Sequence, residues 1–201
     1  MHSPPNYDVV VCGASLAGST AATLLARQGL RVALLERATD PNSYKKVCTH
    51  FIQPSATPTL QRLGVVDQLE RAGAVRNSMD MYTRFGWIEH SIEAHGYSVR
   101  RQVLDPLLRT TAAATPGVEL LMGHTVTGLV RESGRVVGVR GDAGERTFEF
   151  RANLVVAADG RNSKVAQLAE VPAVSAPNNR FIYFAYFRGL RMPAGNRSLY
   201  W

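Results

Sequence analysis

The sequence predicts an α/β fold in which a Rossmann-like βαβ domain is interleaved with a β-sheet domain. Three observations predict it. An apolar strand, a Gly-rich turn, a helix and a second apolar strand follow one another within the first 36 residues. Residues 79–93 are rich in aromatic and β-branched side chains, as in a β-hairpin. Strand and helix patterns of the first kind return after this hairpin, so we expect the chain to pass between two domains.

The composition is that of a globular protein, with 201 residues, 45% hydrophobic and 19% charged. Two cysteines, Cys12 and Cys48, are too few for a disulfide framework and favour a reducing compartment, so we expect a cytoplasmic location. The net charge of +7 comes from scattered arginines, which favours solvated side chains over a nucleic-acid surface. The sequence shows neither a signal-peptide pattern nor an apolar run long enough for a membrane span.

The first elements form a βαβ unit. An apolar strand at 8–12, a helix at 16–28 and a strand at 31–36 have the spacing of such a unit, whose crossover is right-handed. Several turn-forming residues mark 39–54 as a loop. Two short helices, each closed by a glycine, are expected at 58–63 and 65–71.

The rest of the chain alternates between sheet and helix. The hairpin at 79–93 has its turn near Gly86. A helix is expected at 101–114, with Pro106 in or near its first turn, where a missing N–H is tolerated. The remaining pattern predicts strands, including a hairpin around Gly134, at these residues: 118–121, 125–132, 136–140, 147–151, 154–158 and 180–188.

The Gly-rich turn reads Gly13-x-Ser15-x-x-Gly18. The first glycine permits a tight turn, the middle position lets backbone approach a pyrophosphate, and the third lets the helix pack close to the strand. The N-terminus of the helix then offers free N–H groups to phosphates. Ser15 departs from the usual glycine, so its Cβ narrows the approach, although its hydroxyl can contact phosphate.

Glu36 ends the second strand, 23 residues after Gly13 (36 − 13). An acid at this point accepts hydrogen bonds from the ribose hydroxyls of a dinucleotide and repels a 2′-phosphate, which argues against NADP at this site. The alternative is an ordinary βαβ unit with a solvent-facing Glu36.

Two further motifs are Arg101-Gln-Val-Leu-Asp105 and Val155-Val-Ala-Ala-Asp159-Gly160. With them the chain resembles the p-hydroxybenzoate hydroxylase-like FAD-dependent monooxygenases, and equally their relatives, the geranylgeranyl reductase-like oxidoreductases and flavin-dependent halogenases. The resemblance implies that Arg101 contacts the phosphate or ribose region of FAD. It also implies that Asp159-Gly160 lies near FAD and that Lys46 belongs to a basic loop facing it.

The motifs and the resemblance together give one set of candidate cofactor-binding residues: Gly13, Ser15, Leu16, Ala17, Gly18, Glu36, Arg37, Lys46, Arg101, Val126, Asp159 and Gly160. No side chain is predicted as a catalytic acid or base, and no spacing predicts a metal site. Alternatives stay open, because Arg101 can be a surface arginine at a helix start, Lys46 a solvated lysine, and Asp159-Gly160 a simple strand-end turn.

The resemblance implies an FAD-dependent oxidoreductase, most of all an NAD(P)H-dependent monooxygenase that hydroxylates an aromatic or polyketide-like small molecule. An isoprenoid-type reductase, for which Cys48 is a hint, or a halogenase of the same fold is the alternative. A third is a truncated, non-catalytic FAD- or ADP-binding fragment.

The resemblance also implies a downstream Gly-Asp segment that we do not find, so we expect the N-terminal half of a longer enzyme. In this half, the FAD-binding domain would comprise residues 1–73 and 99–170. Residues 74–98 and 171–201 would form an incomplete substrate-domain sheet, in which the aromatic run at 181–187 is either sheet core or a substrate contact. The expected partners are a small-molecule substrate and either the missing C-terminal half or a second copy.

Overall fold

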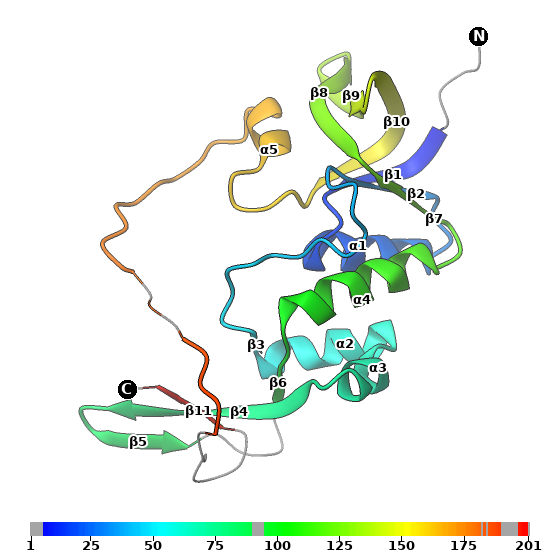
Figure 1. Ribbon diagram of the computed structural model, residues 1–201. Coiled ribbons are helices and arrows are strands. Elements are labelled where there is room, and N and C mark those ends of the chain that lie inside the picture. Colours follow the sequence, from blue (N-terminus) through cyan, green and yellow to red (C-terminus); the bar gives the residue numbers. More distant parts are fainter. Residues whose placement is uncertain (1–5, 90–94, 182, 184, 190–196, 201) are drawn as a thin grey trace.

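The computed structural model describes residues 6–89, 95–181, 183, 185–189 and 197–200, in which two sheets are separated by a layer of helices (Figure 1). The helices are α1 (Leu16–Ala26), η1 (Pro54–Ala56), α2 (Thr57–Leu63), α3 (Val66–Arg71), α4 (Arg101–Ala113) and α5 (Lys164–Leu168). The strands are β1 (Asn6–Cys12), β2 (Val32–Glu36), β3 (Phe51–Ile52), β4 (Val75–Thr83), β5 (Gly86–Glu89), β6 (Gly96–Ser98), β7 (Val118–Met122), β8 (His124–Glu132), β9 (Arg135–Ala143), β10 (Arg146–Ala157) and β11 (Arg197–Tyr200). None of these helices is long and apolar enough to cross a membrane.

The first sheet has the strand order β7-β2-β1-β10-β9-β8. β1 pairs in parallel with β2 and β10, and β2 pairs in parallel with β7, which confirms the predicted βαβ unit. Because parallel strands end at the same edge of a sheet, the residues that follow β1, β2 and β10 meet there. The turns that carry Gly13, Glu36 and Asp159 are therefore neighbours.

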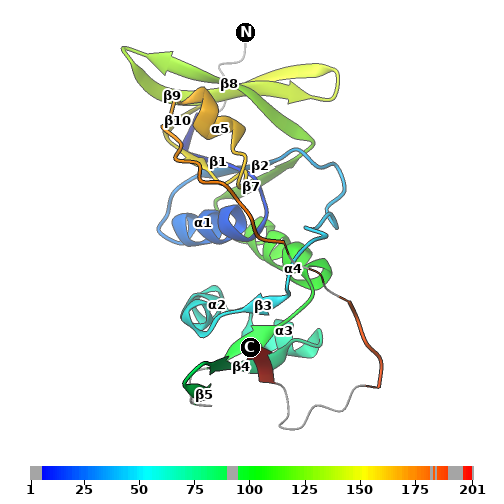
Figure 2. The same ribbon diagram turned by 90° about the vertical axis from the view of Figure 1, so that its left-hand side faces the viewer.

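The core of this sheet forms on both of its faces. β1 and β2 are continuous apolar runs, typical of strands buried on both sides, and Val10 and Leu34 are fully buried. α1 packs on one face, with α4 beside it, and the antiparallel strands β8, β9 and β10 curl over the other (Figure 2). The turns that follow β1, β2 and β10 are thus held by a rigid scaffold.

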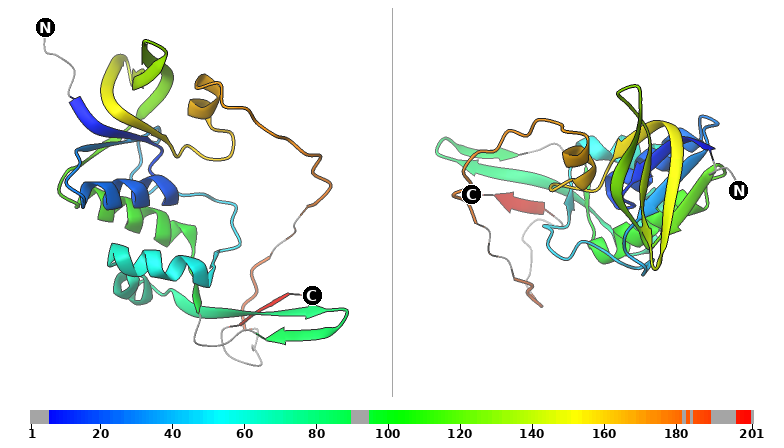
Figure 3. Two further views of the ribbon diagram at one scale, coloured as in Figure 1. Left: turned by 180° about the vertical axis from the view of Figure 1, so that it is seen from behind. Right: turned by 90° about the horizontal axis from the view of Figure 1, so that it is seen from above.

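The second sheet has the order β11-β4-β6-β3, with β5 paired to β4. The β4–β5 pair confirms the hairpin predicted near Gly86; the end of that predicted hairpin, at 90–93, lies outside the described residues. β3 lies inside the stretch expected to be a loop, because Phe51 and Ile52 pair with β6. A second core cluster joins α2, α3, β6 and α4 around the buried Tyr97, and so connects this sheet to the helices (Figure 3).

Three predicted elements differ in the structure. The strands expected at 147–151 and 154–158 are one strand, β10, and Leu154 is 50% exposed because β9 pairs with β10 only as far as Arg151. Pro106 is the sixth residue of α4, beyond its first turn. The described residues of 172–189 contain no strand and pair with neither sheet. Phe181 is 77% exposed, and Phe184 is not described.

Candidate cofactor site

The Gly-rich turn packs so closely that two of its positions admit only glycine. Gly13 has a left-handed φ of +102°, and a Cβ on it would lie 2.6 Å from the carbonyl oxygen of Ala158. A Cβ on Gly18 would lie 1.7 Å from the carbonyl oxygen of Gly13. The predicted roles in turning the chain and in close helix packing are therefore confirmed for Gly13 and Gly18.

The N-terminus of α1 faces this turn without a side-chain cap. Ser15 is the N-cap residue, but its hydroxyl makes no cap hydrogen bond and instead accepts one from Nη2 of Arg101 at 2.9 Å. The first intrahelical bond runs from the N–H of Ser19 to the carbonyl of Ser15. The N–H groups of Leu16 and Ala17 precede it and carry the partial positive charge of a helix start, an arrangement that suits an anion.

Arg101 is held in place by a buried ion pair. Its Nε and Nη2 donate to the two carboxylate oxygens of Asp105 at 2.6 and 3.0 Å, while Nη2 also reaches Ser15. The two side chains are 9% and 1% exposed, so the alternative of a surface arginine is wrong. Two parallel hydrogen bonds fix the plane of the guanidinium, and its Nη2 contacts the Gly-rich turn at Ser15.

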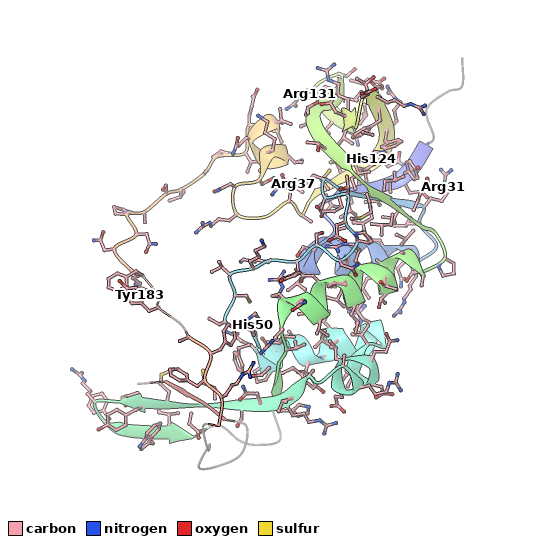
Figure 4. All side chains as sticks on the ribbon, viewed as in Figure 1. Arg31, Arg37, His50, His124, Arg131 and Tyr183 are labelled. Carbon is pink, nitrogen blue, oxygen red and sulfur yellow. The ribbon has the colours of Figure 1, made fainter. Side chains whose placement is uncertain are left out.

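Glu36 also contacts the Gly-rich turn. Its carboxylate accepts hydrogen bonds from the N–H of Ala14 at 2.9 Å and from that of Ala38 at 3.0 Å. A carboxylate has about four lone-pair sites, so acceptor capacity remains for a ribose hydroxyl. The next residue, Arg37, is exposed in the loop after β2 (Figure 4).

Asp159 organises the turn after β10. One carboxylate oxygen accepts from the hydroxyl of Ser163 at 2.5 Å and the other from the N–H of Val165 at 3.1 Å, so the side chain caps α5. Gly160 is left-handed, with φ +97°. The backbone of Asp159 touches Gly13, and burial, with a smaller contribution from the Asp159 charge, raises the pKa of Cys12 to about 12.

A basic hollow of about 250 Å³ lies where α4 begins. Lys46 is among the residues that line it: Tyr44, Lys46, His50, Arg100, Gln102 and Tyr186. His50, labelled in Figure 4, has a left-handed φ of +61°, and its ring stacks on Tyr186, with Nε2 2.6 Å from the hydroxyl. Burial, together with the charges of Arg100 and Arg101, lowers the pKa of His50 and so favours its neutral form.

The structure does not gather all predicted residues at one point. The Gly-rich turn itself contains Gly13, Ser15 and Gly18. Glu36 and Arg101 contact this turn, and Asp159 adjoins it. Lys46 lies in the basic hollow. Val126 lies on β8, opposite Gly141, where it is half-buried against the core.

Sequence reasoning missed two buried side chains on α4. Asp105 is part of the predicted motif but was given no role, and Arg109 was not predicted. In the structure, Arg109 donates from Nε to the carbonyl of Ala14 at 3.1 Å. The available signal was a spacing of four, which puts Arg101, Asp105 and Arg109 on one helix face. This charged stripe alone does not predict that the three side chains are buried, because their partners lie in loops whose positions the sequence does not give.

Comparison with known proteins identifies the family of this chain. The FAD binding domain family matches residues 6–184. Digeranylgeranylglycerophospholipid reductase 2 of Methanopyrus kandleri is 33% identical over 163 residues, covering 81% of this chain and 40% of that protein. Kynurenine 3-monooxygenase of Salinispora arenicola is 37% identical over 172 residues, covering 79% of this chain and 37% of that protein. The chain spans less than half the length of these relatives.

A solved structure shares the fold. The myxobacterial chondrochloren halogenase CndH, an FAD-dependent halogenase, superposes with a TM-score of 0.73 at 25% identity, over 82% of this chain and 40% of that one. The matched proteins are thus a reductase, a monooxygenase and an FAD-dependent halogenase. With a family match over most of its length and a glycine-tight turn at the expected place, this chain belongs to the FAD binding domain family.

Proposed function

We propose that this chain binds FAD, with the diphosphate at the Gly-rich turn and the adenosine ribose at Glu36. One observation carries the proposal: the N-terminus of α1 has no side-chain cap and lies beside the buried Arg101. Free N–H groups and a fixed guanidinium are the donors that a diphosphate needs. Because Gly13 and Gly18 have no side chains, the backbone of the turn can come close to such a ligand.

The other candidate residues are assigned by position. The N–H groups of Leu16 and Ala17 would bind phosphate oxygens, and Arg37 would flank the ribose after Glu36. Lys46 would face the cofactor from the basic hollow. We keep Val126, Asp159 and Gly160 as cofactor contacts implied by the resemblance, although Asp159 also caps α5.

The larger function we infer is that of an FAD-dependent oxidoreductase, most of all an NAD(P)H-dependent monooxygenase of an aromatic or polyketide-like small molecule. The similarity to kynurenine 3-monooxygenase supports this reaction class. When bound, FAD supplies the redox chemistry, while the chain binds it, orients it and excludes water. We assign residues 1–73 and 99–170 to the FAD-binding domain, and residues 74–98 and 171–201 to part of the substrate domain.

A reductase is the second candidate. It is favoured by the similarity to digeranylgeranylglycerophospholipid reductase 2 and by the place of Cys48. The sulfur of Cys48 accepts from the N–H of His50 at 3.4 Å, and His50 lines the basic hollow. A reductase would saturate a carbon–carbon double bond without oxygen uptake, so an oxygen electrode separates the two reactions.

The test is the absorbance spectrum of the chain after it is mixed with FAD and desalted. We expect retained flavin peaks in the wild type and weaker retention in Arg101→Gln, with Arg62→Gln, an exposed arginine on α2, as the control. A colourless wild-type protein would contradict the proposal. Retained FAD without NAD(P)H oxidation would restrict the function to cofactor binding by this segment.

A further inference from the structure

We propose that Arg109 is a positioning residue that sets the Gly-rich turn against the loop after β2. This role rests on the proposed function, because both segments flank the proposed FAD site. Arg109 lies two turns beyond Arg101 on α4 and is 3% exposed. A guanidinium this deeply buried needs hydrogen-bond partners, and the identity of those partners shows what it holds.

The partners of Arg109 come from two separate segments. Nε donates to the carbonyl of Ala14, in the Gly-rich turn, at 3.1 Å. Nη1 donates to the carbonyl of Ser43 at 3.1 Å and also to that of Pro41. One side chain therefore bridges two loops that lie 95 and 66 residues before it in the sequence.

Asp105 reinforces the same bridge one turn earlier. Its carboxylate accepts from the N–H of Lys45 at 3.0 Å while it pairs with Arg101. The face of α4 that contains these residues thus contacts the turn through Arg101 and Arg109, and the loop through Asp105 and Arg109. Lys46, proposed to face the cofactor, directly follows the anchored Lys45.

A lysine cannot replace Arg109 in this position. The guanidinium is planar and aims donors at carbonyls in different directions, whereas an ammonium is a compact charge on a flexible stem. Arg109→Lys keeps the charge but cannot keep both loops at their present separation. The variant therefore tests geometry separately from charge.

The experiment measures hydrogen exchange and FAD affinity in four chains: wild type, Arg109→Lys, Arg62→Lys and Leu107→Ala. Leu107 is partly buried on α4 and contacts the second core cluster, so its truncation destabilises the helix without touching either loop. Arg62 is an exposed arginine on α2 and controls for the substitution itself.

In Arg109→Lys we expect amide exchange at residues 13–15 and 43–45 to rise about tenfold, with the Kd for FAD weakened by about the same factor. Arg62→Lys should change neither. Leu107→Ala should lower the Tm but leave the exchange pattern of the two loops and the Kd unchanged. Unchanged loop exchange in Arg109→Lys, or the same pattern in Leu107→Ala, would overturn the positioning role.

Two further outcomes are distinguishable. If the wild type fails to bind FAD, the exchange data on the free chain still decide the role of Arg109, and only the proposed function fails. If Arg109→Lys does not fold, the wild-type Nε–H signal of Arg109, assigned through bonds by NMR, decides it. A slowly exchanging signal supports the bridge, and a signal lost to fast exchange contradicts it.

Discussion

Two turns lie side by side at the same edge of the parallel sheet, and they are held in opposite ways. The turn after β1 is fixed mainly by residues far away in the sequence: Ala14 by Glu36 and Arg109, and Ser15 by Arg101, at separations of 22, 95 and 86 residues. One local hydrogen bond, from the Ser19 hydroxyl to the Ala14 carbonyl, adds to them. The side chain of Asp159 fixes the turn after β10 locally, since it binds groups only 4 and 6 residues ahead. The residue before it, Ala158, is joined to β1 by a backbone hydrogen bond to Cys12.

This difference bears on ligand binding. A turn that satisfies its own polar groups leaves fewer of them for a ligand. Asp159 is an example, because its carboxylate caps α5. A turn braced from outside can leave its helix N–H groups free for a ligand and still be rigid, as the Gly-rich turn does. We therefore propose that the external bracing by α4 makes the turn after β1 the better site for the diphosphate.

The largest effect should come from breaking the external bracing at its buried ion pair. Asp105→Ala leaves Arg101 as an uncompensated buried charge, so we expect a loss of about 3–5 kcal/mol in the free energy of unfolding. The matched change in the other turn, Asp159→Ala, removes a cap and should cost only about 1 kcal/mol. Urea unfolding of both variants tests this ranking, and equal losses would contradict it.

The next effect compares a glycine from each turn. In Gly18→Ala the new Cβ meets the Gly13 carbonyl, so we expect a loss of about 3 kcal/mol in the free energy of unfolding and weak FAD binding. Gly160→Ala places its Cβ in open space and should cost about 1–2 kcal/mol through its left-handed φ alone. The account is contradicted if Gly160→Ala is the more destabilising.

A serine from each turn should separate binding from stability. Ser163→Ala removes the cap to the N–H of Ala166 and should cost about 1 kcal/mol of stability without changing FAD affinity. Ser15→Ala removes the acceptor for Arg101 and should weaken FAD binding about threefold with little change in stability. Paired measurements of Tm and Kd show whether the effects divide in this way.

The smallest effect concerns Cys12, whose carbonyl accepts from the N–H of Ala158 between the two turns. Its pKa is raised from 9.0 to about 12, so the unfolded state ionises first and stability falls as pH rises from 9 towards 12. Between pH 8 and 9.5 we expect Cys12 to account for a loss of about 0.8 kcal/mol. Urea unfolding at both pH values should show this loss in the wild type but not in Cys12→Ala.

Local patterns were sufficient to predict much of the fold. The structure confirms β1 and β2 and the tight turn at Gly13 and Gly18. Both features could be predicted because their patterns lie within short stretches of sequence. β3 forms only because β6 lies beside it, and the aromatic stretch before Arg188 lacks a partner strand among the described residues. Pairing between distant segments is not encoded in the periodicity of either segment.

The candidate site divides in the same way. The motif around Arg101 identified one end of the charged face of α4, because the motif is local. The contacts of Arg109 depend on where the loop at 41–45 crosses the helix, and the hollow around His50 depends on Tyr186, 136 residues later. Such contacts follow from tertiary packing, which a single sequence does not specify.

The most direct test of the central claim is a titration of the ¹⁵N-labelled chain with ADP, followed by NMR. The account predicts that the largest amide shifts occur at residues 13–18, with a shift of the Arg101 Nε–H signal, while residues 159–165 change less. Shifts centred on 159–165, or none at 13–18 at saturating ADP, would contradict the assignment of the diphosphate to the Gly-rich turn.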